Sequence, residues 1–140
     1  MNATRYLPFM GRLMIGLPFA MSGAGKLTAY GATISMITAA GLPFPPAAYG
    51  VAVAVELGGG LLLTLGYRAR IVAAVMAIFA LATALTFHTH FADQNQMINF
   101  LKNVMMAGGL LQIVAFGAGA ISLDSRRQGA ELTSRPAAIA

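Results

Sequence analysis

Long apolar blocks alternate with short polar segments along the chain. Four of these blocks approach or reach about 20 residues, the length that a helix needs to cross the hydrocarbon core of a bilayer. Because lipid offers no partner to backbone N–H and C=O groups, blocks of this length predict helices. We therefore predict an all-α transmembrane four-helix bundle, with helices over approximately residues 6–26, 47–66, 69–89 and 97–117.

The segment between the first two helices, "KLTAYGATISMITAAGLPFPP", is too long for a tight turn. Its first part is mildly amphipathic, and Gly41 followed by prolines is typical of a helix end. This pattern predicts a short interfacial or re-entrant helix between helices 1 and 2. The second connection, "YRAR", predicts a tight hairpin, and the third, "HTHFADQNQ", a polar loop.

The composition agrees with a membrane protein. Hydrophobic residues make up 58% of the 140 residues and charged residues only 9%, whereas soluble domains average about 25% charged residues. The net charge is +5. Since the basic residues stand at the ends of the apolar blocks, they predict membrane orientation and contacts with lipid head groups, and no nucleic-acid partner.

The distribution of Lys and Arg predicts the orientation. With four spans, one side of the membrane receives Arg5, Arg68, Arg70, Arg126, Arg127 and Arg135, and the other only Lys26 and Lys102. The positive-inside rule then predicts a multi-pass protein of the bacterial inner membrane with both termini in the cytoplasm. Residues 1–127 form the predicted membrane domain, and the polar residues 128–140 a disordered cytoplasmic tail.

Two charged residues lie inside the predicted spans, Arg12 in the first and Glu56 in the second. A charge at a helix centre costs about 2.5 to 3.5 kcal/mol on insertion scales, so each residue needs a partner or a function. We predict a buried polar core in which Arg12 and Glu56 form an interhelical pair. Three roles remain open: a pair that only fixes helix register, a protonated Glu56, or a proton or ligand function.

A second polar cluster is predicted at the opposite end of the bundle. It consists of Lys26, His88, Lys102 and Asn103, at the ends of helices 1 and 3 and the start of helix 4. These side chains suit a head-group site for a quinone or a lipid whose tail lies among the helices. The alternative is a loop that is polar because it meets water, with lysines that extend to the interface.

Some kinds of site are not expected. The chain has no cysteine, and both histidines belong to one helix, which excludes thiolate ligation and haem ligation from two helices. We predict no metal site and no covalently bound cofactor; a surface ion on His88, His90 and Asp93 is the weaker alternative. The glycines inside the spans predict close helix packing, at Gly23, Gly59, Gly60, Gly108 and Gly109.

The segments "GRLMIGLPFAMSGAGKL", "GLPFP", "VELGGGLLLTLGYRAR", "LTFHTHF", "FLKNVMMAGGLL" and "SLDSR" occur in this order. Together they resemble the DoxX family of small four-helix bacterial membrane proteins, over roughly residues 9–127. The resemblance carries over Arg12, Ser22, Gly23, Lys26, Glu56, Gly59, Gly60, Arg70, His88, Lys102 and Asn103. The family is similar to subunits named for quinol oxidase and thiosulfate:quinone oxidoreductase systems.

The resemblance implies an accessory or quinone-interacting subunit of a membrane redox system. The implied cofactor is a quinone, and the implied partners are membrane lipids and oxidoreductase subunits, with a homo-oligomer also open. The chain has no self-contained catalytic motif, so any oxidoreductase role would be that of a subunit. The alternative is a non-catalytic membrane scaffold or chaperone that binds a partner helix or lipid. A small-solute or ion transporter that titrates Glu56 is weaker, because four spans show no inverted repeat.

Overall fold

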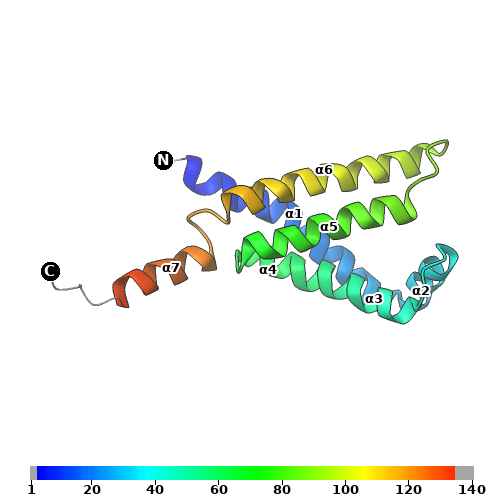
Figure 1. Ribbon diagram of the computed structural model, residues 1–140, viewed down its shortest axis with the longest axis horizontal. Helices are drawn as coiled ribbons and strands as arrows, with labels where there is room; N and C mark the ends of the chain where they lie inside the picture. Colours follow the sequence, from blue (N-terminus) through cyan, green and yellow to red (C-terminus); the bar gives the residue numbers. More distant parts are fainter. Residues whose placement is uncertain (1–2, 135–140) are drawn as a thin grey trace.

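The computed structural model describes residues 3–134, and they form an all-α fold without strands (Figure 1). The elements are α1 (Ala3–Thr28), α2 (Tyr30–Ala39), α3 (Pro45–Val53), the π-helix η1 (Ala54–Gly59), α4 (Gly60–Leu65), α5 (Ala69–Phe87), α6 (Gln94–Phe116) and α7 (Leu123–Ser134).

The four predicted long helices are present, with ends that differ by a few residues. The second is a continuous rod in which α3, η1 and α4 follow one another from Pro45 to Leu65. This rod, α5 and α6 are long and apolar enough to cross a membrane. The fourth long helix, α1, has 26 residues and would span about 39 Å. Its charged residues Arg5, Arg12 and Lys26 make it more polar than the rod or α5.

The long helices pack as two antiparallel pairs. α5 lies along α6, and α1 lies along η1 and α4. The pairs meet near the tight turn that joins α4 to α5, and they diverge toward the end that carries α2 and the α5–α6 loop (Figure 1). The core between the pairs is apolar, and its fully or nearly fully buried members include Phe19, Leu63, Met76 and Leu110.

A short helix is also present between the first two long helices, as the sequence predicts. α2 ends at a turn where Gly41 has a φ of +73°, a conformation that glycine adopts without steric cost. The ring of Tyr30 at the start of α2 packs edge-on against the ring of Tyr49 in α3, with centroids 4.9 Å apart. α2 is thereby attached to the rod, at the end where the two helix pairs diverge.

The prediction of a disordered tail from residue 128 is wrong for the residues up to 134, because these belong to α7. The start of α7 is fixed by Asp124, whose carboxylate accepts hydrogen bonds from the backbone amides of Arg68 at 2.7 Å and Ala69 at 2.8 Å. The amide of Asp124 in turn donates to Gly66 O at 2.9 Å. Residues 135–140 lie outside the described part of the chain.

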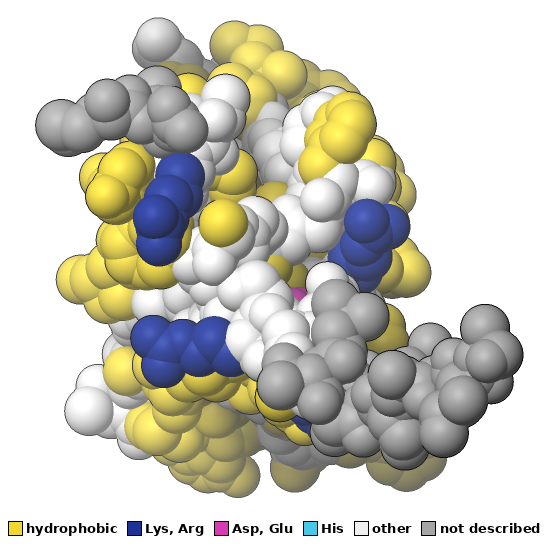
Figure 2. Space-filling model, turned by 90° about the vertical axis from the view of Figure 1, so that its left-hand side faces the viewer, with side chains coloured by type: hydrophobic (Ala, Val, Ile, Leu, Met, Phe, Trp, Pro, Cys, Tyr) yellow, Lys and Arg dark blue, Asp and Glu magenta, His cyan; other side chains and the backbone are white. Residues whose placement is uncertain are grey.

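Figure 2 shows the end of the molecule at which α1 begins and α7 lies, with basic side chains distributed around it. The described arginines of this end come from the start of α1, the α4–α5 turn, the start of α5 and α7: Arg5, Arg68, Arg70, Arg126 and Arg127. We call it the arginine end. The two lysines lie toward the opposite end, near the end of α1 and the start of α6.

Candidate functional site

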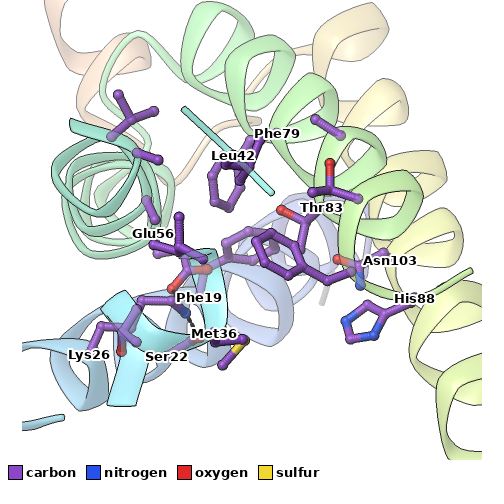
Figure 3. A pocket seen from close by; sticks show the side chains of 18 of the residues that line it. Phe19, Ser22, Lys26, Met36, Leu42, Glu56, Phe79, Thr83, His88 and Asn103 are labelled. Carbon is purple, nitrogen blue, oxygen red and sulfur yellow. Dashed lines mark hydrogen bonds and ion pairs between the residues drawn. The ribbon is translucent and has the colours of Figure 1, made fainter. Parts of the chain in front are cut away.

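A cavity of about 680 Å³ lies where the two helix pairs diverge (Figure 3). Side chains of α1, α2, α3, η1, α5 and α6 surround it. Most of the wall is apolar and includes Phe19, Met36, Ile37, Leu42, Phe79 and Met106. The polar lining side chains are Ser22, Lys26, Thr33, Glu56, Thr83, Thr86, His88 and Asn103. We call this space the outer cavity.

An ion pair forms one wall of the outer cavity. Lys26 Nζ lies 2.6 Å from Glu56 Oε2 and also donates to Ser22 Oγ at 3.2 Å. Ser22 and Lys26 are four residues apart on α1 and therefore share the helix face that looks toward η1. Tyr49 Oη donates to the carbonyl oxygen of Lys26 at 3.2 Å, which fixes the end of α1 against α3.

Glu56 reaches the cavity from a π-helical turn. The six residues of η1 replace the ordinary i→i+4 pattern with i→i+5 bonds, which widens the helix by one residue. Such turns occur frequently at functional sites. This turn was not predicted from the sequence, since no residue type specifies it. The available signal was the glycine triplet 58–60, interpreted there only as packing.

The opposite wall of the outer cavity carries His88 and Asn103 (Figure 3). His88 follows the last residue of α5, and its Nδ1 lies 2.9 Å from Gln96 Oε1. Asn103 lies in α6 and donates from Nδ2 to Asn99 O at 2.9 Å. Lys26 and Glu56 thus face a second polar wall across an apolar space.

The structure does not bring Lys102 into this cluster, which corrects the predicted four-residue site. Lys102 is exposed and does not line the outer cavity. Consecutive residues of an α-helix differ by about 100° in direction. Because Asn103 points into the cavity, its neighbour Lys102 lies on another face of α6.

The predicted Arg12–Glu56 pair is also wrong, although both residues are buried. α1 and the rod run antiparallel, with Gly23 against Leu57 and Gly16 against Thr64. In this register Glu56 lies level with residue 24, twelve residues along α1 from Arg12, an axial separation of about 18 Å. Hydropathy predicts the approximate depth of each charge but not the register between the helices.

Arg12 instead binds main-chain carbonyl groups. Its Nη1 donates to Leu63 O at 3.0 Å and to Thr64 O at 2.9 Å, and its Nη2 donates to Ile121 O. The guanidinium also lies 5.6 Å from the centre of the Phe9 ring. Arg12 therefore ties the end of α4 to the segment that leads into α7.

Four of the five predicted packing glycines lie against another helix. A Cβ atom on Gly23 would lie 2.4 Å from Leu57 N, and one on Gly60 would lie 2.6 Å from Ala20 N. Gly59 and Gly109 are close to side chains of Met76 and Ile15. Gly108 faces open space, so its predicted packing role is wrong. Gly16, which was not predicted to be a packing residue, lies against Gly60 and Thr64.

Comparison with known proteins identifies the family. The DoxX family model matches residues 7–89, more than half of the chain. The chain belongs to the DoxX family. The SURF4 family model also matches, over residues 50–129. The DoxX match includes Lys26, Glu56 and His88, and the SURF4 match includes Asn103.

Two curated relatives come from Escherichia coli (strain K12). The inner membrane protein YqjF is 34% identical over 118 residues, which cover 82% of this chain and 87% of YqjF. The inner membrane protein YphA is 33% identical over 141 residues, covering 90% of this chain and 100% of YphA. No solved structure matches significantly. This DoxX-family chain is a multi-pass inner-membrane protein.

Proposed function

We propose that the outer cavity binds a quinone and that the protein is an accessory, quinone-interacting subunit of a membrane redox system. The observation that carries the proposal is an apolar cavity of about 680 Å³ with hydrogen-bonding groups on two opposed walls. Small-molecule sites commonly have about 300–1,000 Å³ and few polar groups. A quinone combines an apolar body with two carbonyl acceptors on opposite edges of its ring.

The side chains match this chemistry. Lys26 has an ammonium group with three donors, of which Glu56 and Ser22 engage two. On the other wall, the amide of Asn103 supplies a donor. His88 adds a polar ring whose Nδ1 already lies 2.9 Å from Gln96 Oε1. Glu56 balances the charge of Lys26 and holds the ammonium at the wall. A bound quinone would supply the electron transfer, in exchange with a partner oxidoreductase.

The test is the binding of a short-chain quinone to the purified protein in detergent, measured as the rise in thermal unfolding temperature. We expect Lys26→Met to weaken binding about tenfold or more, because a hydrogen bond to a charged donor contributes about 1.5–3 kcal/mol. Asn103→Leu should weaken binding less. Lys102→Met is the matched control, since Lys102 lies outside the cavity, and it should bind as the wild type does.

Two outcomes contradict the proposal. One is the absence of a shift with either a benzoquinone or a naphthoquinone, which would favour a scaffold that binds a partner helix or lipid. The other is an equal loss of binding in Lys26→Met and Lys102→Met, which would indicate a nonspecific effect of charge.

We also propose that both termini lie in the cytoplasm, which puts the outer cavity near the periplasmic face. The excess of arginine at the arginine end supports this orientation. Since the chain has no cysteine, single cysteines are specific reporters. An impermeant maleimide should label Ala92→Cys in intact spheroplasts and Gln128→Cys only after lysis; the reverse pattern would contradict the proposal.

A further inference from the structure

A second cavity of about 560 Å³ lies at the arginine end. Its walls are the start of α5, the end of α6 and the segment between α6 and α7. The lining residues that matter for its chemistry are Arg68, Arg70, Ile71, Phe116 and Asp124. The length of α5, 19 residues, separates this space from the outer cavity.

The arginines of this second cavity have no carboxylate partner among the described side chains. The one acidic side chain in the lining, Asp124, already accepts from the backbone amides of Arg68 and Ala69. Arg70 lies beside Gly117, where a Cβ atom would come within 3.3 Å of Arg70 Nε. Both arginines are exposed. The Arg68 guanidinium also lies 5.9 Å from the centre of the Tyr67 ring. The lining of the cavity therefore has an excess of positive charge.

The same cavity has an apolar flank. Ile71 is 63% exposed and Phe116 is 78% exposed. They lie at the adjoining ends of two membrane-spanning helices, where acyl chains would contact them. A small soluble anion would gain nothing from contact with these apolar side chains. An amphiphile with an anionic head and an acyl chain would contact both the arginines and the apolar flank.

The segment between α6 and α7 that lines the cavity is fixed by hydrogen bonds. Arg12 donates to Ile121 O, and Ser122 Oγ donates to Gly119 O at 2.8 Å. The amide of Ser125 donates to Ser122 Oγ at 3.1 Å. The segment between α6 and α7 is thus held in place without a ligand, so that binding requires little ordering of the chain.

We propose that the second cavity binds the phosphate head group of an anionic phospholipid. Arg68 and Arg70 contact the phosphate oxygens, a geometry that guanidinium groups favour. Ile71 and Phe116 contact the first part of an acyl chain. Basic pockets between transmembrane helices are known to hold anionic lipids in this manner. This site is separate from the proposed quinone site and does not depend on it.

The test uses the full chain in detergent, titrated with phosphatidylglycerol, phosphatidylcholine or inorganic phosphate. Binding is followed by native mass spectrometry and by thermal unfolding. We expect phosphatidylglycerol to bind and to raise the unfolding temperature, with little effect of the other two. Arg70→Gln and Arg68→Gln should each weaken the binding of phosphatidylglycerol about fivefold, as expected for one arginine near an anionic surface.

The matched control is Arg126→Gln, an exposed arginine at the same end that does not line the cavity. It should leave the affinity for phosphatidylglycerol unchanged. Equal losses in Arg126→Gln and Arg70→Gln would overturn the proposal, because only diffuse electrostatics would then operate. Equal binding of phosphatidylcholine, or a full effect of phosphate alone, would also overturn it. If either Arg68→Gln or Arg70→Gln does not fold, the other variant still tests the proposal.

Discussion

Arg12 and Glu56 are both charged, both lie within the helix bundle and both are nearly inaccessible, with exposures of 1% and 7%. Their surroundings differ in kind. Arg12 donates only to main-chain carbonyl oxygens, at the junction of α4 and the segment before α7. Glu56 is bound by a side chain, Lys26, and lines a cavity. Burial alone therefore does not distinguish a structural charge from a candidate site.

The difference lies in what the partners can do. The carbonyl groups that Arg12 binds belong to the last turn of α4 and to the segment before α7, and they cannot turn away without disturbing the fold. Lys26 is partly exposed, with a side-chain exposure of 25%, and its flexible chain can redirect the ammonium group. Arg12 is therefore held by the main chain, whereas the Lys26–Glu56 pair depends on two side chains.

The largest effect is expected for Arg12→Met. It removes hydrogen bonds to three carbonyl groups, and hydrogen bonds to a charged group contribute about 1.5–3 kcal/mol each. The free energy of unfolding in mixed micelles should fall by at least about 3 kcal/mol. Arg126→Met, on the exposed face of α7, is the control and should change it little. A loss for Arg12→Met as small as that of the control would contradict a stabilising role for the three hydrogen bonds of Arg12.

A smaller loss of stability is expected for Gly60→Ala. This variant tests the close packing of α1 on the rod between Arg12 and Glu56. The added Cβ would lie 2.6 Å from both Ala20 N and Gly16 O, so the backbones must separate. Overpacking of this kind costs about 1–3 kcal/mol. Gly58→Ala is the matched control, because a Cβ there meets nothing within 4 Å. Equal unfolding temperatures for the two variants would argue against the close approach of α1 and the rod.

The smallest effect on stability is expected at the Lys26–Glu56 pair. Lys26→Glu or Glu56→Lys alone creates a like-charge pair, and the double exchange should recover about 1 kcal/mol, as for a partly exposed ion pair. The measurement is a double-mutant cycle on the free energy of unfolding. The corresponding exchange of Arg12 and Glu56 should recover nothing. A recovery of stability in the Arg12 and Glu56 exchange would be evidence for a direct Arg12–Glu56 pair, which the helix register excludes.

The sequence predicted the long helices well because lipid imposes both the length and the apolar character of a span. The short helix before Gly41 and most packing glycines could also be predicted, since each has a local signal in the sequence. The partners of Arg12 and Glu56 could not be predicted. Hydropathy gives the depth of a residue along a helix, but neither the register with a neighbouring helix nor the direction in which the side chain points. The same limit explains Lys102, which is adjacent to Asn103 in sequence but points elsewhere.

The helical tail was missed for a different reason. Residues 128–134, within the range predicted to be disordered, are mostly polar or small, and composition alone predicts disorder for such a segment. The helix starts where Asp124 caps the first amides of α5, a contact between positions 55 and 56 residues apart. Interactions at that distance cannot be inferred from a local pattern.

The wide turn of η1 has a consequence for how this sequence tolerates change in length. The extra residue offsets the angular phase of α3 relative to α4 by about 100°. Both segments pack against α1, while α3 also contacts α2 and α4 also contacts α5. Deleting one residue of η1 would allow the rod to become a continuous α-helix. The faces of α3 and α4 would then rotate relative to each other, and both could no longer keep their present contacts. Glu56 sits at the point where the phase changes, which makes the position of this carboxylate a property of residue number as much as of residue type.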